Sequence, residues 1–313
     1  MTERARTVFF GSGSFAVPIL AALSGSPDVD LVGVVSAPDR PAGRHGRLTT
    51  VPVARRAREI GLTVLQPPRL RAPDAAATIA ALQPRLGVLA DYGQIVPPVI
   101  LDLFPAGILN VHPSRLPRHR GATPIPNTIL AGDPLAGVTV IRMDAGLDTG
   151  PIITAVEWPL MGTETAAELE DAAARFGAEL LTAAVGGWLD GSLAARPQDD
   201  AAATLTRTLR RQDGRLDPAQ GAAALERQVR AFQPWPGSFV EADGRRLLVW
   251  VSEVTPERIG DAPGRLEADD DGLYLTTAGG RLQLLEVQPA GGRRMSGAEL
   301  LRGRPALAGA SVA

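Results

Sequence analysis

The 313-residue chain contains no cysteine and no lysine. Without cysteine there can be no disulfide, no zinc–thiolate site and no thiol nucleophile. Without lysine there can be no Schiff base between a protein amine and a carbonyl, and no pyridoxal-phosphate lysine. All 32 basic residues are therefore arginine. Two large classes of covalent catalysis are excluded before any motif is considered.

Histidine is also scarce, since only His45, His112 and His119 occur, so we expect no histidine-rich metal site and no metal. No apolar run reaches the roughly 18 residues of a membrane span. The N-terminus lacks the basic and apolar regions of a signal peptide. We therefore expect a cytoplasmic protein without a membrane partner. The net charge of −2 argues against a general nucleic-acid binder, but a local basic patch remains possible.

Short apolar runs alternate with helix-like segments through residues 1–190. Strands are expected at Thr7–Phe10, Leu31–Val35, Thr63–Leu65, Leu86–Ala90, Ile108–Val111, Val138–Met143 and Pro151–Glu157. Helices are expected between them, near 15–23, 53–60, 72–82 and 98–103. A longer helix follows from about Ala166 to Leu189, with Thr165 as its N-cap. This alternation predicts an α/β domain with a parallel sheet covered on both faces.

The pattern changes after residue 190. Residues 191–206 contain glycine, proline, paired aspartates and an alanine run, as is typical of a linker. After one more helix near 220–232, several short strands follow without intervening helices, which predicts a small β-barrel. The expected domains are therefore 1–190, a linker over 191–206, and a barrel over 207–313.

The segment Gly11–Ala16 follows a strand, opens a helix and fits the pattern G-x-G-x-x-A of dinucleotide-binding folds. Such folds usually place an acidic residue at the end of the second strand. Here that strand runs into Ser36, and Asp39 comes several residues late in a proline-rich loop. We therefore interpret the glycines as permitting a tight strand–helix turn, and we expect no NAD site.

Asn110 and His112 lie two residues apart at the end of an expected strand, so they share a face of the sheet. Ligands bind at this edge of a parallel sheet. An amide beside an imidazole can hold an oxyanion and move a proton. Asp148 lies in a glycine-hinged loop and can orient the imidazole. Each residue also has a purely structural interpretation: Asn110 could form an Asx turn, His112 could be a core histidine, and Asp148 could be a turn carboxylate. Together, without an adjacent nucleophile, they indicate acyl transfer to an external amine.

Three segments at and beside these residues resemble the signature of the folate-dependent formyltransferases. They are Asn110–His112, Ser114–Gly121 and Asp144–Gly150. Three others narrow the resemblance to the branch that formylates methionyl initiator tRNA for translation initiation. They are Pro38–Arg44, Arg230–Pro236 and Gln288–Met295. The resemblance extends over nearly the whole chain in the same order.

The resemblance implies a Rossmann-like domain followed by a barrel similar to an oligonucleotide-binding fold. It implies 10-formyltetrahydrofolate as the donor, Asn110 as the ligand of the formyl oxygen and His112 as stabiliser of the developing oxyanion. Asp148 would orient His112 and help relay the proton of the attacking amine. The implied folate contacts are Ser114, Arg115, Leu116 and Pro117, and the implied tRNA contacts are Arg40, Arg44 and Arg47.

One departure is Arg115, because the family usually has two leucines after the serine of the folate segment. We expect a monomer. The competing hypotheses are a formyltransferase acting on a sugar nucleotide or glycinamide ribotide, an NAD-dependent oxidoreductase, and a non-catalytic RNA-binding protein.

Overall fold

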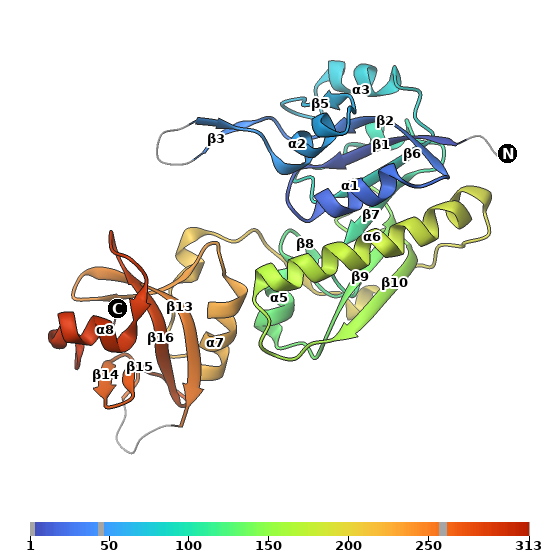
Figure 1. Ribbon diagram of the computed structural model, residues 1–313. Helices are drawn as coiled ribbons and strands as arrows, with labels where there is room; N and C mark the ends of the chain where they lie inside the picture. The colour runs from blue at the N-terminus through green and yellow to red at the C-terminus, as the bar shows by residue number, and fades with distance from the viewer. Residues whose placement is uncertain (1–3, 43–46, 257–261, 313) are drawn as a thin grey trace. The chain divides into compact units, whose positions relative to one another are not determined.

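The computed structural model describes residues 4–42, 47–256 and 262–312, with the side chains of residues 41, 42 and 47 excepted. The chain divides into two compact units (Figure 1). Unit 1 comprises Met1–Pro124, Leu135–Pro159 and Glu170–Arg207. Unit 2 comprises Ile125–Pro134, Leu160–Leu169 and Thr208–Ala313.

Unit 1 is built on a seven-stranded sheet. Its strands, in spatial order, are β10 (Ile152–Pro159), β9 (Leu135–Arg142), β7 (Ile108–His112), β6 (Leu86–Ala90), β1 (Ala5–Gly11), β2 (Val29–Val35) and β5 (Val64–Leu65). From β7 to β5 neighbouring strands are parallel, whereas β9 and β10 are antiparallel additions at one edge. The predicted α/β class with a Rossmann-like parallel sheet is confirmed.

Both faces of this sheet are covered by helices. The helices associated with unit 1 are α1 (Ala16–Ser24), α2 (Pro52–Glu59), α3 (Pro73–Ala80), α4 (Pro98–Leu101) and α6 (Ala166–Asp190). In β1, Phe9 joins the core under α1 and α6, whereas Val8 and Phe10 join the core under α3 and α4. Because both faces of the sheet are buried under helices, the sequences of its parallel strands are continuous apolar runs. Among the described residues, no helix is both long and apolar enough to span a membrane.

Unit 2 contains an antiparallel sheet in the order β12-β13-β16-β15-β14, curled into a half-barrel, with β17 paired to β16. Its strands are β12 (Ser238–Ala242), β13 (Arg245–Thr255), β14 (Leu266–Asp269), β15 (Gly272–Thr276), β16 (Arg281–Pro289) and β17 (Met295–Ser296). Its helices include α5 (Pro124–Ala131), α7 (Ala222–Ala231) and α8 (Gly297–Gly303). The end of the chain bridges both edge strands, because Val312 pairs with Ala242 and Ser311 with Arg265.

The segment over 191–206, expected as a linker, makes regular contacts with unit 1. Arg196 and Ile152 exchange two backbone hydrogen bonds of 2.7 Å. β11 (Leu205–Thr206) pairs in parallel with β8 (Arg120–Gly121). Two short 3-10 helices lie at Asp200–Ala202 and Arg211–Gly214, and a third at Pro305–Leu307. Unit 1 accordingly extends to Arg207.

The turn at Gly11–Ala16 is filled by neighbouring chain segments. Ser12 donates its N–H to the Asp91 carbonyl at 2.9 Å, and its hydroxyl accepts from Ala37 N–H at 3.0 Å. A Cβ on Gly13 would lie 1.7 Å from Asp91 Oδ2, so a larger residue there would displace the Asp91 carboxyl group. A dinucleotide fold needs free N–H groups for pyrophosphate at this place. Here the place holds a carboxyl group.

Candidate active site

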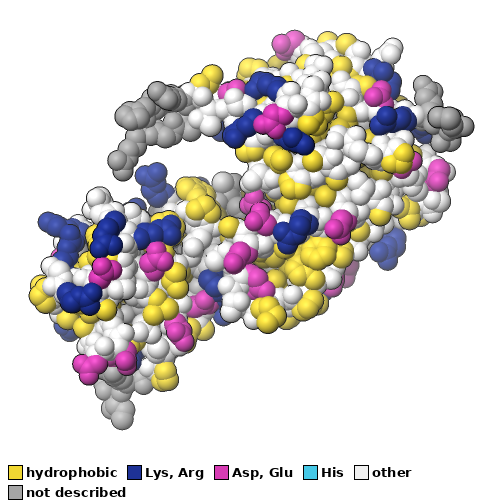
Figure 2. Space-filling view, viewed as in Figure 1, with side chains coloured by type: hydrophobic (Ala, Val, Ile, Leu, Met, Phe, Trp, Pro, Cys, Tyr) yellow, Lys and Arg dark blue, Asp and Glu magenta, His cyan; other side chains and the backbone are white. Residues whose placement is uncertain are grey.

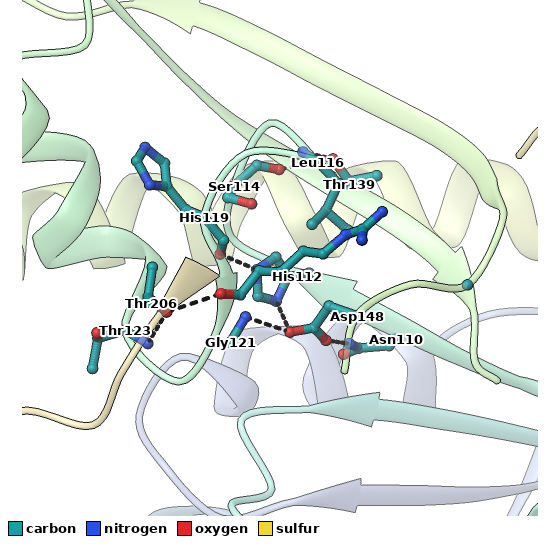
Figure 3. A network of polar contacts seen from close by, with 12 residues as sticks. Asn110, His112, Ser114, Leu116, His119, Gly121, Thr123, Thr139, Asp148 and Thr206 are labelled. Carbon is teal, nitrogen blue, oxygen red and sulfur yellow. Dashed lines mark hydrogen bonds and ion pairs between the residues drawn. The ribbon is translucent and has the colours of Figure 1, made fainter. Parts of the chain in front are cut away.

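β7 places Asn110 and His112 at the carboxyl edge of the parallel part of the sheet (Figure 3). Both residues are buried, with 6% and 5% of their surface exposed. Two-residue spacing on one strand turns both side chains to the same face. The sequence prediction that they lie together at the strand end is met by this placement.

Asp148 reaches the same point from the loop between β9 and β10. Its Oδ1 accepts a hydrogen bond from Asn110 Nδ2 at 3.1 Å, and its Oδ2 accepts from Gly121 N–H at 2.8 Å. Oδ2 also lies 3.7 Å from His112 Nδ1. The structure therefore brings Asn110, His112 and Asp148 into one network (Figure 3).

The backbone of His119 fixes which imidazole nitrogen carries a proton. His112 Nε2 lies 3.0 Å from the His119 carbonyl oxygen (Figure 3). A carbonyl can only accept, so Nε2 must be the donor. In the neutral ring Nδ1, the nitrogen that faces Asp148, is then the proton acceptor. His112 is thus prepared to take a proton at Nδ1 beside a carboxylate.

The segment Ser114–Pro117, which is expected to bind folate, is held in place by hydrogen bonds to Thr139 of β9. Thr139 Oγ1 donates to the Ser114 carbonyl at 2.7 Å and accepts from Leu116 N–H at 3.2 Å. The Ser114 hydroxyl donates to the Arg118 carbonyl at 2.7 Å. Ser114 and Leu116 are buried, and Pro117 is half-buried. The loop is consequently fixed in shape beside His112.

The side chain of Arg115 turns to β10. Its Nε lies 3.0 Å from Glu157 Oε1. The Arg115 stem passes over Gly137, where an added Cβ would approach Arg115 Cγ to 2.6 Å. Arg115 therefore forms an ion pair with Glu157 through Nε, with side chains 29% and 47% exposed.

The basic segment expected as a loop is partly a hairpin. β3 (Arg40–Ala42) pairs antiparallel with β4 (Arg47–Thr49) and extends away from the rest of unit 1 (Figure 1). Arg40 is exposed. Arg44 and the Arg47 side chain, also predicted to contact tRNA, lie outside the described residues.

The base of this hairpin is fastened by Asp39. Asp39 Oδ1 accepts from Gln66 Nε2 at 2.7 Å, and Oδ2 accepts from Thr50 Oγ1 at 3.2 Å. The Gln66 hydrogen bond in particular lowers the pKa of Asp39 below its usual value. The hairpin is thereby anchored on the sheet by a carboxylate that favours its ionised form.

A second perturbed carboxyl lies at the glycine turn. Removal of the Asp91 carboxyl from water, and then the nearby charge of Glu170, raise its pKa to about 6. Glu170 Oε1 accepts from the Ser14 hydroxyl at 2.5 Å. This pair lies at a different strand end from the Asn110 network. Within the described ranges, no three histidine or carboxylate side chains gather where they could hold a metal ion.

Several residues that contact the network were not expected from the sequence to be site residues. Gly121 contributes only a backbone N–H, and Thr139 and Thr206 contribute hydroxyl groups. Gln198 donates to the carbonyls behind Asp148 from the segment that resembles a linker. Such contacts depend on tertiary packing, which spacing along the chain does not encode.

Comparison with known proteins identifies the family of the chain. Residues 5–185 match the formyl transferase family model, and residues 208–305 match the model of the formyl transferase C-terminal domain. The chain is 42% identical over 300 residues to a methionyl-tRNA formyltransferase of Chloroflexus aggregans, covering 95% of this chain and 97% of that protein. It is 41% identical over 305 residues to the Pseudomonas syringae pv. tomato methionyl-tRNA formyltransferase, covering 97% and 96%.

Solved structures agree in fold at lower identity. HypX from Aquifex aeolicus, in complex with tetrahydrofolic acid, aligns with a TM-score of 0.62 and 16% identity, over 96% of this chain and 47% of that longer chain. The sugar 3N-formyl transferase WlaRD aligns with a TM-score of 0.63 and 17% identity, over 90% of this chain and 97% of that one. From the matched family models and these relatives, the chain belongs to the formyl transferase family.

Proposed function

We propose that this enzyme transfers the formyl group of 10-formyltetrahydrofolate to the free amino group of methionyl initiator tRNA, for translation initiation. Relatives with that acceptor in their names match 95% or more of the chain at about 41% identity. Structural neighbours carry tetrahydrofolic acid or 5-N-formyl-THF in their descriptions, which supports a folate donor.

The network of Asn110, His112 and Asp148 carries this proposal. One hydrogen of the Asn110 amide is given to Asp148, which leaves the other for the formyl oxygen. The amine nitrogen attacks the formyl carbon, and a new C–N bond forms while the bond from that carbon to N10 of the folate breaks. The amine proton passes to His112 Nδ1, with Asp148 stabilising the charged ring, and is then delivered to N10.

His112 has a second role in the same step. Once Nδ1 is protonated, the ring can donate to the oxygen on which negative charge develops, as oxyanion donors do. Its other nitrogen stays bonded to the His119 carbonyl throughout. Asp148 acts on both partners, because it holds the Asn110 amide and faces the imidazole.

For the donor, we propose that Ser114, Arg115, Leu116 and Pro117 line the folate cleft. Thr139 gives this segment a fixed main-chain shape. The ion pair of Arg115 with Glu157 limits what its guanidinium can contribute. Main-chain groups and the half-buried Pro117 are the better candidates for contact.

For the acceptor, we propose that Arg40, Arg44 and Arg47 contact the tRNA. Pro38–Arg47 contains these three arginines against one aspartate in a chain of net charge −2. Figure 2 shows further arginine side chains gathered on the visible face of unit 2. In unit 2, the guanidinium of Arg294 stacks over the Trp250 ring at 3.5 Å, and arginine and aromatic side chains together are typical of surfaces that bind single-stranded RNA. We place the reaction in the cytoplasm and expect a monomeric enzyme.

The chemistry is tested with the His112→Ala variant, assayed with saturating 10-formyltetrahydrofolate and methionyl initiator tRNA. We expect turnover to fall by ~10²–10⁴-fold, because an acid–base group and an oxyanion donor are lost together. Folding is checked by circular dichroism. Near-normal turnover of a folded variant would remove His112 from the mechanism.

The acceptor site is tested separately with Arg40→Ala, for which we expect a higher KM for tRNA and an unchanged KM for folate. The matched control is Arg175→Ala, which removes an exposed arginine from α6. A KM for tRNA that is unchanged in the folded Arg40 variant would contradict a hairpin contact, whereas equal loss of tRNA and folate use would indicate misfolding.

A further inference from the structure

We infer that Gln198 is a positioning residue that holds the catalytic Asp148 in place. The inference rests on the proposed role of Asp148. Gln198 is 50 residues from Asp148 in sequence, beyond the long helix α6. It is half-buried, and both ends of its amide are committed to hydrogen bonds.

The backbone of Asp148 needs external support. Its φ is +53°, in the left-handed region that favours glycine and that other residues adopt less readily. The neighbouring Gly150 has no room for a side chain, since a Cβ there would lie 1.9 Å from the Arg142 carbonyl oxygen. A loop with this shape keeps it only when surrounding groups fix it.

Gln198 supplies that support from the outer side of the loop. Its Nε2 donates to the Asp148 carbonyl at 2.8 Å and to the Gly150 carbonyl at 2.7 Å. The two backbone hydrogen bonds between Arg196 and Ile152 hold Gln198 at the start of β10. One amide thus ties down both carbonyls that flank the turn behind the carboxylate.

Arg120 determines the direction of the Gln198 amide. Its Nε and Nη2 donate to Gln198 Oε1 at 3.0 and 2.8 Å, so Oε1 must face the guanidinium and Nε2 must face the loop. Arg120 is itself only 5% exposed, and its Nη2 also donates to Asp200 Oδ1 at 2.7 Å. The Gln198 amide therefore cannot flip without placing its own NH2 group against the Arg120 guanidinium.

The residue after Arg120, Gly121, also holds Asp148 in place. Its N–H donates to Asp148 Oδ2 at 2.8 Å (Figure 3). Arg120 and Gly121 thus act on Asp148 from two directions, through Gln198 on the backbone and directly on the carboxylate. The distance from Oδ2 to His112 Nδ1, 3.7 Å, is set by this support.

The test uses two variants of the full chain. Gln198→Glu keeps an oxygen for Arg120, but replaces the NH2 group that donates to the two loop carbonyls by a carboxylate oxygen, which repels them. Gln198→Leu removes the amide altogether. We expect kcat to fall by roughly 10- to 100-fold in both, since displacement of a reacting group by about 1 Å costs rates of this order. KM for folate and for tRNA should change less than about threefold, because the binding segments are not altered.

A double-mutant cycle separates positioning from general stability. In the Asp148→Asn background, replacing Gln198 should cost less than about threefold, because its effect passes through Asp148. The matched control is Gln228→Leu, which also removes an amide that donates to two backbone carbonyls, those of Asp213 and Arg215 in unit 2. This control should lower the melting temperature while leaving kcat within twofold.

The outcomes are distinct. Wild-type kcat in the Gln198→Glu variant, or additive losses in the cycle, would overturn the positioning role while leaving the proposed function standing. A wild-type enzyme that transfers no formyl group to methionyl-tRNA would overturn both.

Discussion

Replacement of Asp148 by asparagine tests the centre of the mechanism with almost no change in side-chain volume. The carboxylate accepts from Asn110 through Oδ1 and from Gly121 through Oδ2, and it faces His112. An asparagine side chain has one oxygen, so one of these two donors must lose its acceptor. A buried donor without a partner costs about 1–3 kcal/mol.

The variant also removes the negative charge that stabilises protonated His112. Loss of support for an acid–base group typically reduces the rate by ~10²–10⁴-fold, or about 3–5 kcal/mol in activation free energy. We therefore expect kcat of the Asp148→Asn variant to fall within that range. The assay is formyl transfer to methionyl initiator tRNA at saturating folate, with thermal unfolding measured in parallel.

The control for this experiment is Asp144→Asn in the same loop. Asp144 Oδ1 accepts from Gly146 N–H at 2.9 Å and from Thr149 Oγ1 at 2.7 Å, and asparagine retains an oxygen for both. Its kcat should remain within about threefold of wild type. If the Asp148→Asn variant were equally active, the carboxylate would have no part in the reaction, and the argument from its contacts would be refuted.

Three further outcomes are expected. Because the pKa of Asp91 is raised to about 6, ionising it destabilises the fold, so stability should fall as pH rises from about 4 to 6. The Asp91→Asn variant should lose this dependence in urea unfolding and be more stable at pH 7. Asp91 as a whole is exposed, so solvent screening should limit the gain in free energy of unfolding to about 1 kcal/mol, rather than the roughly 3 kcal/mol of a fully buried carboxyl. A variant with the same pH dependence of stability as the wild type would contradict this prediction. The Arg115→Leu variant should change the KM for folate by less than about threefold, because Arg115 is paired with Glu157, and a tenfold rise would assign its guanidinium to the donor. A chain ending at Asp200 should melt below one ending at Arg207, because the shorter chain lacks β11; equal melting temperatures would show that β11 adds no stability.

Much of the fold follows from the apolar pattern of the sequence. β6 occupies Leu86–Ala90 as expected, and α6 covers the expected helix from Ala166. Thr165 caps that helix in a box with Glu168, whose Oε2 accepts from Thr165 N–H at 2.9 Å. These elements are long or fully buried, so local pattern and tertiary packing favour the same structure.

Short elements were missed for the opposite reason. β8 and β11 have two residues each, too few for any periodicity. α8 was also missed, although Ser296 and Glu299 form a capping box that the sequence contains. For such segments the partner strand or the surrounding core decides the conformation, and neither is visible in local sequence.

The boundaries of the two units could not be predicted from the composition of the sequence. Residues 125–134 and 160–169 lie within the stretch 1–190 that was expected to form the first domain, but they belong to unit 2. Arg227 donates to the Leu130 carbonyl at 3.1 Å, and Arg230 donates to the Glu164 carbonyl at 2.8 Å. In the site, spacing brought Asn110 and His112 together, whereas the support from Gln198 depends on how a distant segment returns to β10.

The most direct test of the account is the acceptor preference of the wild-type enzyme. With 10-formyltetrahydrofolate as donor, kcat/KM is measured for methionyl initiator tRNA, a dTDP-linked amino sugar and glycinamide ribotide. We predict formylated methionyl-tRNA as the main product, favoured by at least about a hundredfold, because binding elements specific to one acceptor raise its kcat/KM over the others. Faster formylation of the sugar nucleotide or the ribotide, or no transfer to methionyl-tRNA, would contradict the proposed function.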